Sequence, residues 1–118
     1  EYPFPDEGYG IYNFPFGGGM EHQTMVGQGT FIESVSAHEL AHMWWGNDVG
    51  CRTWRDLWLN EGLATYSEAV WAERQPGSSG LPAYSAWMNA RRPDASALGG
   101  TVYTTDLSSV ENVFNYDM

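Results

Sequence analysis

Two histidines four residues apart, His38 and His42, constrain this chain more than any other feature of its sequence. They lie in residues 30–45, where apolar residues recur at helical spacing, so both imidazoles share one face of the expected helix. Two imidazoles on one face can bind one metal ion, and Glu39 can hold a metal-bound water without being a ligand itself. Two solvated histidines on a surface helix are the alternative. Burial is favoured over that alternative by the apolar neighbours Leu40, Ala41, Met43, Trp44 and Trp45.

A catalytic zinc site takes three protein ligands and leaves the fourth position open. Glu61, nineteen positions after His42, is the best candidate for the third ligand, because it opens a second expected helix joined to the first by a short link. Helices joined in this way can pack antiparallel, and we expect Gly62 to allow their close approach. The alternative explanation of Glu61 is a carboxylate that interacts with the helix dipole. Glu68, two turns further along, is the alternative ligand.

Composition separates a Gly-, Pro- and aromatic-rich beginning, which predicts short strands, from a remainder whose apolar spacing predicts helices. Strands followed by helices predict an α+β fold rather than alternating βαβ units. The length is that of one domain, and because the chain begins with Glu1 we expect it to be a piece of a longer protein. The expected parts are a strand and loop region (1–29, with a strand at Met20–Val26 and a turn at Gly27 and Gly29), a metal-binding helix pair (30–75, with helices at about 30–45 and 60–74), and a helical and loop region (76–118, with helices at 81–91 and from Ser108).

The charge balance excludes several classes of function. Fifteen acidic and five basic residues give a net charge of -10, and the chain contains no Lys. A phosphate-binding lysine loop and Schiff-base catalysis are therefore excluded, and nucleic acid is a poor partner for so acidic a chain. No apolar run reaches the roughly 18 residues of a membrane span. The single cysteine, Cys51, allows no intrachain disulfide.

The spacing His38-Glu39-Leu40-Ala41-His42, eighteen residues and then Glu61 resembles the ligand pattern of the gluzincin metallopeptidases. Within that group the chain is similar to the zinc aminopeptidases related to aminopeptidase N and leukotriene A hydrolase. The resemblance covers nearly the whole chain. It is carried by Met43-Trp44-Trp45-Gly46-Asn47, by residues 56–66 (Asp-Leu-Trp-Leu-Asn-Glu-Gly-Leu-Ala-Thr-Tyr), by Gly18-Gly19-Met20-Glu21-His22, which is similar to the exopeptidase motif Gly-x-Met-Glu-Asn, and by its lead-in Tyr2-Pro3-Phe4.

The resemblance implies an α+β catalytic core with a thermolysin-like helix pair around the metal. One Zn²⁺ per chain would be bound by His38, His42 and Glu61. Glu39 would act as general base for the zinc-bound water and would then deliver the proton to the leaving amine.

The resemblance also implies an aminopeptidase, which hydrolyses the first peptide bond of peptides that have a free N-terminus. Glu21 would pair with the α-ammonium of the substrate, because an internal peptide bond would leave that carboxylate unpaired. The backbone around Gly18, Gly19 and Met20 would align the substrate as an added strand.

Two features depart from the family pattern. His22 stands where the family usually has Asn, and we expect it to keep a hydrogen-bonding role rather than to bind the metal. The family also stabilises the oxyanion with a tyrosine hydroxyl from a helix downstream of the third ligand. Tyr103 and Tyr116 lack the Lys-Gly that normally follows this tyrosine, so we interpret both as packing aromatics and expect the catalytic tyrosine beyond Met118.

The resemblance implies an N-terminal β-rich domain and a C-terminal helical domain, which we expect to lie outside these 118 residues and to pack against them in the parent protein. Two other functions stay open. A thermolysin-type endopeptidase is disfavoured by the segment Gly18–Glu21. A metal-binding module without turnover is disfavoured by Glu39, which metal binding alone does not require, but truncation could still make the isolated chain inactive. Thr65 and Glu68 share a helix face with Glu61 and could orient the ligands or serve ordinary polar packing.

Overall fold

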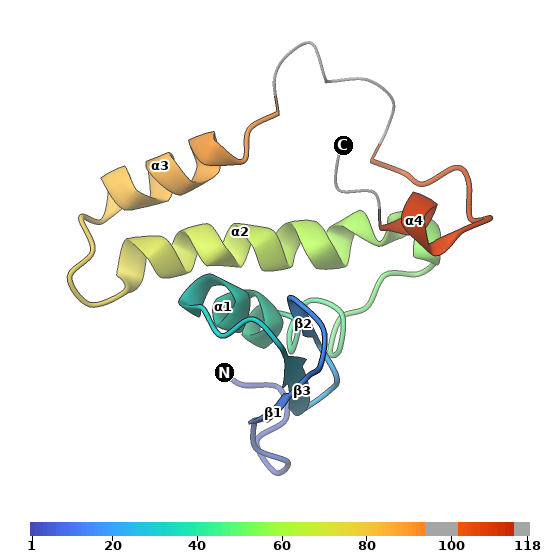
Figure 1. The fold of residues 1–118 in the computed structure, drawn as a ribbon, viewed down its shortest axis with the longest axis horizontal. Helices are drawn as coiled ribbons and strands as arrows, with labels where there is room; N and C mark the ends of the chain where they lie inside the picture. The colour runs from blue at the N-terminus through green and yellow to red at the C-terminus, as the bar shows by residue number, and fades with distance from the viewer. Residues whose placement is uncertain (94–101, 115–118) are drawn as a thin grey trace.

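A computed structural model describes residues 1–93 and 102–114 of the chain, with three short strands preceding the helices (Figure 1). Helix α1 lies between the small sheet and the long helix α2, and α3 packs against the other side of α2 (Figure 1). This order confirms the prediction of strands followed by helices. The elements are β1 (Gly10–Asn13), β2 (Gly19–Met20), β3 (Met25–Gln28), α1 (Glu33–Ala41), the 3₁₀ turn η1 (Trp54–Asp56), α2 (Trp58–Arg74), α3 (Leu81–Ala90) and α4 (Val110–Val113).

The strands form one sheet in the order β1-β3-β2, in which β3 runs parallel to β1 and antiparallel to β2. The prediction of a continuous strand from Met20 to Val26 is wrong, because a turn divides it. The amide of His22 donates to the carbonyl of Met20 at 2.9 Å, and Thr24 has a φ of 60°, in the left-handed region that no strand residue adopts. The predicted turn at Gly27 is also wrong, since Gly27 pairs with Met20 inside the sheet.

Helix α1 begins later and ends earlier than the predicted range of 30–45. Its N-cap residue, Ile32, has no side chain that can cap the helix, and after Ala41 the chain continues in turns as far as Asp48. Ser36 fastens the helix to the sheet instead. Its hydroxyl donates to the carbonyl of Ile32 and accepts from Nε2 of Gln28 at 2.8 Å, so the first turn of α1 is tied to β3.

Three side-chain contacts show that α1 and α2 pack antiparallel, as predicted. Trp71 Nε1 donates to Glu33 at 3.4 Å, while His38 and His42 contact residues progressively nearer to the start of α2. The role predicted for Gly62 is wrong, because it lies on the exposed side and a Cβ there would meet nothing. The small residues that α2 buries are alanines instead. The buried apolar residues are Val26, Ala41, Met43, Leu57, Ala64, Ala69 and Ala72.

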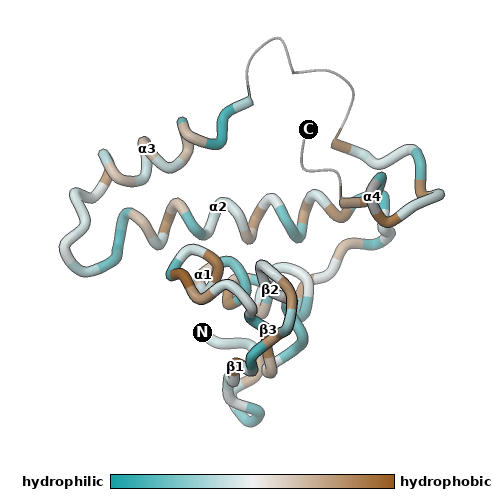
Figure 2. Tube along the Cα trace, in the orientation of Figure 1, coloured by the Kyte–Doolittle hydropathy of each residue, from teal (hydrophilic) through white to brown (hydrophobic). Residues whose placement is uncertain are grey.

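The C-terminal part of the described chain is fastened to the turn before α2. Arg55 in η1 donates through Nη1 to the carbonyl of Thr104 at 2.8 Å, and the Thr104 amide donates back to the carbonyl of Arg55. Along α2, apolar residues alternate with hydrophilic ones rather than forming one long apolar run (Figure 2). Among the described residues, no helix combines the length and the apolar character needed to cross a membrane.

Candidate metal centre

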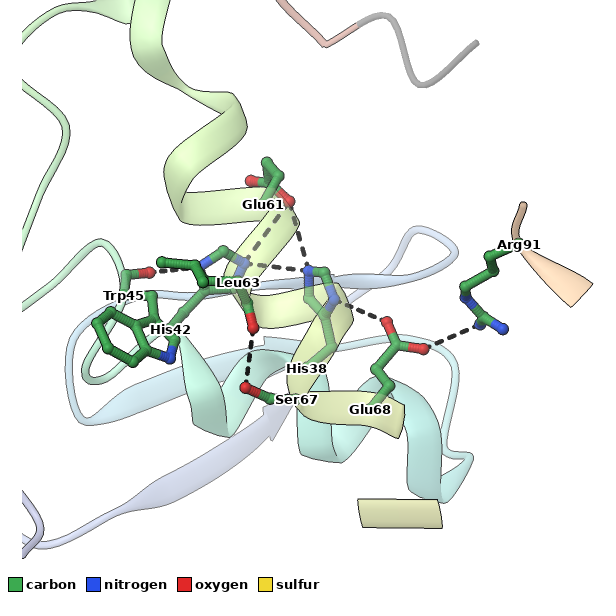
Figure 3. Close-up of polar contacts among 8 residues, drawn as sticks. All are labelled: His38, His42, Trp45, Glu61, Leu63, Ser67, Glu68 and Arg91. Atoms are coloured by element: carbon green, nitrogen blue, oxygen red, sulfur yellow. Dashed lines mark hydrogen bonds and ion pairs between the residues drawn. The ribbon is translucent and has the colours of Figure 1, made fainter. Parts of the chain in front are cut away.

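His38 and His42 project from the same face of α1 toward α2 (Figure 3). One helical turn separates them, so their rings come together with centroids 4.8 Å apart and the two Nε2 atoms 3.1 Å apart. His42 is almost completely buried, and the side chain of His38 is 18% exposed. Two imidazole nitrogens therefore converge at a site that is closed on the His42 side and accessible on the His38 side.

Glu61 completes this cluster from the first turn of α2. Its Oε2 lies 3.4 Å from Nε2 of His38 and 3.7 Å from Nε2 of His42. Donor atoms bound at about 2.0–2.1 Å by one tetrahedral ion lie ~3.3 Å from one another, and the three observed separations bracket that value. Two imidazole nitrogens and a carboxylate oxygen also form a donor set that zinc prefers. The residues present thus fit a zinc ion in both spacing and chemistry.

The other nitrogen of each imidazole is held by a hydrogen-bond acceptor. Nδ1 of His42 donates to the carbonyl of Trp45 at 2.9 Å, and Nδ1 of His38 donates to Oε1 of Glu68 at 2.8 Å (Figure 3). In the neutral imidazole, a proton kept on Nδ1 leaves the lone pair on Nε2, which is the nitrogen that faces the cluster. Both rings are therefore held in the tautomer and orientation that metal binding requires.

The electrostatics of the cluster are those of two imidazoles sharing a carboxylate. Burial raises the pKa of Glu61, but hydrogen bonds from His38 and His42 outweigh it and lower the pKa to about 2. Burial lowers the pKa of His38, but hydrogen bonds to Glu61 and Glu68 raise it to about 9; the pKa of His42 is also raised, through Glu61. The cluster therefore attracts positive charge strongly, and a metal cation would compete with protons for the same nitrogens.

Glu39 lies beside this cluster with its carboxylate buried against the sheet. A carboxylate oxygen of Glu39 and one of Glu21 lie within 4.8 Å of each other and of a ring nitrogen of His42. Burial raises the pKa of Glu39 to about 7, against the opposing effect of His38 and His42. The carboxylate also occupies the space where a Cβ on Gly19 would lie. A buried carboxyl group with a near-neutral pKa is suited to accepting and donating protons.

Glu21 belongs to the turn between β2 and β3 that the sequence did not predict. Asn47, in the turns after α1, donates through Nδ2 to the carbonyl of Glu21 at 2.8 Å. Sδ of Met43 accepts from the Thr24 amide at 3.4 Å on the other side of the same turn. Two residues that follow His38 and His42 in the chain, Met43 and Asn47, therefore hold the turn against the segment after α1.

The glycines before Glu21 lie next to the same turn. The Gly18 amide donates to Oγ1 of Thr30 at 2.9 Å, and its carbonyl accepts from the amides of Gly29 and Thr30. Gly19 and Met20 form β2, which lies at an edge of the sheet among the described residues. His22 contacts Tyr12 instead of the cluster. Its Nδ1 lies 3.2 Å from the hydroxyl of Tyr12, and the two rings are stacked.

The structure places the remaining candidate residues in different surroundings. Glu68 lies at Nδ1 of His38, on the far side of the ring from the converging Nε2 atoms. Among residues 1–93 and 102–114, Thr65 makes no hydrogen bond to a candidate ligand. Tyr103 stacks with the guanidinium of Arg55, whereas Tyr116 lies outside the described residues.

Sequence reasoning missed three contacts around the site: that of the Trp45 carbonyl with His42, that of Asn47 with Glu21, and that of Arg91 with Glu68. The Trp45 carbonyl and the Asn47 amide lie in turns whose geometry no periodic pattern predicts. Arg91, at the end of α3, donates through Nη2 to Oε2 of Glu68 at 2.9 Å (Figure 3). Its one signal in the sequence is scarcity, because five arginines in a chain with fifteen acidic residues are expected to be paired.

Comparison with known proteins gives consistent matches. A family model described as the Peptidase family M1 domain matches residues 11–116. Aminopeptidase Ey of Gallus gallus is 52% identical over 48 residues, which are 41% of this chain and 5% of that protein. Aminopeptidase N of Homo sapiens is 55% identical over 42 residues, 36% of this chain and 4% of that protein. The chain thus spans only a small part of the curated relatives that it matches.

Solved structures match over more of the chain. The M1 zinc metallopeptidase of Deinococcus radiodurans aligns with 97% of this chain and 27% of its own, with a TM-score of 0.68 and 32% sequence identity. A mutant of an M1 zinc metallopeptidase from the same organism, bound to a Tyr-Ser-Ala substrate, aligns with 77% of this chain and 23% of its own, with a TM-score of 0.63 and 36% identity. These matches extend the similarity from the motifs to the arrangement of the elements.

Proposed function

Since this chain belongs to peptidase family M1, we propose that it forms part of the catalytic domain of a zinc aminopeptidase. The observation that carries the proposal is the convergence of His38, His42 and Glu61 beside the buried carboxyl group of Glu39. Metal binding alone requires the first three residues, whereas a protonatable group next to them is what hydrolysis requires.

His38 and His42 would hold the zinc ion through Nε2, and Glu61 through Oε2. Zinc bound there would supply a Lewis acid that polarises a peptide carbonyl and lowers the pKa of water. The Trp45 carbonyl and Glu68 keep the two rings oriented for this role. We further propose that the antiparallel pair α1–α2 is a thermolysin-like helix pair and that each chain binds one zinc.

Glu39 would carry the proton in hydrolysis. Its carboxylate, with a pKa near neutral, can accept a proton from the attacking water at Oε and then donate it to the nitrogen of the departing amine. The nearby edge of the sheet limits where that carboxylate can lie, because Gly19 packs directly against it. The base is therefore positioned by both α1 and β2.

Glu21 would give the site its preference for the first residue of a peptide. An α-ammonium group could pair with its carboxylate, while the substrate backbone adds to the edge strand β2 along Gly18, Gly19 and Met20. The segment next to an internal peptide bond carries no such charge and would leave Glu21 unpaired. Peptides with a free N-terminus are therefore the proposed substrates, in preference to the internal bonds that a thermolysin-type endopeptidase would cleave.

Other parts of the parent protein are proposed to complete the site. The matched solved chains are about four times as long as the region aligned here. We propose that residues 1–118 form a single partial catalytic domain and that segments outside it provide the oxyanion tyrosine. An apolar groove of about 610 Å³ supports packing of further domains on this face. Its lining includes Ile11, Phe31, Leu40, Trp44 and Trp71.

Metal analysis and peptide cleavage, measured together, test the proposal. We expect about one zinc per chain, lost in His38→Ala, and removal of the first residue from a peptide with a free amino terminus but not from its N-acetylated copy. A folded wild-type chain that cannot be loaded with zinc would refute the site. Cleavage is measured on a longer form of the protein that includes the segments proposed to complete the site. Equal cleavage of both peptides by that form would favour the endopeptidase, and zinc binding without cleavage would favour a metal-binding module.

A further inference from the structure

A chain of three contacts leads from the candidate metal ligand His38 to the end of α3. Oε1 of Glu68 accepts from Nδ1 of His38 at 2.8 Å, and Oε2 of the same carboxylate accepts from Nη2 of Arg91 at 2.9 Å. The guanidinium of Arg91 in turn lies 3.8 Å from the centre of the Trp87 ring. Figure 3 shows Glu68 between the imidazole and the guanidinium. A continuous series of side-chain contacts thus connects α1, α2 and the end of α3.

Glu68 has little freedom in this series of contacts. Its side chain is only 10% exposed, and its two oxygens are bound to partners on opposite sides. A carboxylate with one partner can rotate or shift along the imidazole edge, whereas one held at both oxygens keeps a single orientation. Because Glu68 decides where Nδ1 of His38 points, it also decides where Nε2 points.

Arg91 is suited to hold this carboxylate. A guanidinium is planar, is always charged at neutral pH and can stack on an aromatic ring while it donates hydrogen bonds from its edge. Arg91 uses both properties, with Trp87 against its face and Glu68 at its edge. Trp87 and Arg91 belong to the last turn of α3 and the residue after it, so the contact also fixes the end of α3 against α2.

We propose that Arg91 is a positioning residue for the metal centre: through Glu68 it holds His38 in the orientation that binds zinc, and so makes zinc affinity depend on the placement of α3. The proposal rests on the zinc site of the proposed function. An exposed ion pair would contribute little, but this pair fixes a nearly buried carboxylate that itself contacts a ligand. The role concerns ligand orientation and requires no contact between Arg91 and the metal or the substrate.

Zinc affinity of the full chain, measured by competition with a chromophoric chelator, tests the proposal without a catalytic assay. Loss of a group that orients a metal ligand typically weakens metal binding 10–100-fold, so we expect that range for Glu68→Gln and about tenfold for Arg91→Ala, which acts one step further away. Arg91→Lys should recover part of the loss, because it restores the charge but not the stacking plane. Arg74→Ala is the matched control, since it also removes one positive charge, but from an exposed arginine paired with Glu73.

The double variant Arg91→Ala with Glu68→Gln separates positioning from a general effect on the fold. If Arg91 acts through Glu68, the zinc affinity of the double variant should equal that of Glu68→Gln alone. An equal weakening in both backgrounds would overturn the proposal, as would an Arg91→Ala affinity no lower than that of Arg74→Ala. If Arg91→Ala does not fold, Arg91→Met replaces it, because methionine keeps an unbranched side chain over Trp87 but has no N–H groups to donate to Glu68. The same comparisons of zinc affinity then apply to Arg91→Met. A wild-type chain that binds no zinc would instead refute the proposed function.

Discussion

Glu39 and Glu61 lie beside the same two histidines, yet their surroundings give the two carboxyl groups opposite properties. Burial dominates at Glu39 and raises its pKa to about 7. Hydrogen bonds from both imidazoles dominate at Glu61 and lower its pKa to about 2. A difference of this size between two pKa values distinguishes a carboxyl group that exchanges protons from one that stays ionised as a ligand. The assignment of one as base and the other as ligand therefore has a physical basis in the structure.

The substitution Glu39→Gln tests this assignment at a single residue. The amide keeps the size of the side chain but cannot exchange the proton, so we expect turnover to fall by about 10²–10⁴-fold, the usual contribution of acid–base catalysis. Zinc content should stay at the wild-type value if His38, His42 and Glu61 hold the metal, because Glu39 is not one of those three residues. Glu39 does belong to a second candidate metal-binding group with Glu21 and His42, which a loss of zinc would favour. The check is metal analysis together with kcat for a peptide with a free amino terminus. Both are measured on a longer form of the protein that cleaves this peptide. Zinc lost in proportion to activity would show that Glu39 is a ligand or a structural group.

At the scale of elements, the sequence predicted the parts of the site that depend on helical periodicity. Histidines at i and i+4 must share a face, and a glutamate at the start of the next helix meets them once two joined helices pack antiparallel. Turns and contacts between distant segments could not be predicted, because no periodic sequence pattern indicates them. The turn that holds Glu21 depends on the left-handed backbone of Thr24, and the small residue that α2 buries near Glu61 is Ala64, whereas Gly62 had been expected to be buried there. Arg91 reaches Glu68 only because α3 folds back over α2, which no local pattern indicates.

The contact between β2 and α1 gives a prediction at this scale. A Cβ on Gly19 would overlap the Glu39 carboxylate, and the flexible glutamate would move before the backbone did. We expect Gly19→Ala to reduce turnover by about 10²-fold, as displacement of a catalytic group by about 1 Å can do, while zinc stays bound.

Gly17→Ala is the matched control for Gly19→Ala. A Cβ there would meet only Oγ1 of Thr30 at 3.9 Å, and Gly17 does not adopt a positive φ. Its turnover and zinc content should stay close to the wild-type values. Equal kcat in the two variants would show that Glu39 is not confined by β2.

For the whole molecule, the net charge of -10 links the candidate metal centre to the stability of the fold. Glu21, Glu39, Glu61 and Glu68 gather around two histidines, and Arg91 contacts Glu68. Like charges brought together by folding oppose the compact state. A divalent cation between α1 and α2 would offset part of that repulsion, and it would link the two helices that carry most of the buried apolar residues. Zinc is therefore expected to stabilise the fold as well as to serve the reaction.

The stability of the metal-free chain should fall as pH rises from 6.5 to 9. His38 has a folded pKa of about 9 against an ordinary value of 6.5, so its contribution is complete below pH 6.5 and is lost as pH approaches 9. Ionisation of Glu39, whose folded pKa is raised from 4.5 to about 7, removes stability as pH rises through that range. Glu61 acts in the opposite direction, because its depressed pKa gives stability above pH 4.5 that is lost toward pH 2. Each full proton of difference changes the unfolding free energy by about 1.4 kcal/mol per pH unit.

Zinc should reverse this trend, because binding at Nε2 displaces the proton that stabilises the metal-free form. At a fixed concentration of free zinc, the increase in melting temperature should therefore be larger at pH 8.5 than at pH 6. Thermal unfolding with and without zinc across this range measures both effects, and His38→Ala should show a flatter metal-free profile and little response to zinc. A metal-free melting temperature that is constant or rises between pH 6.5 and 9 would show that His38 does not share a proton with Glu61 and Glu68. In that case the three donors would not form the coupled cluster from which the metal centre is inferred.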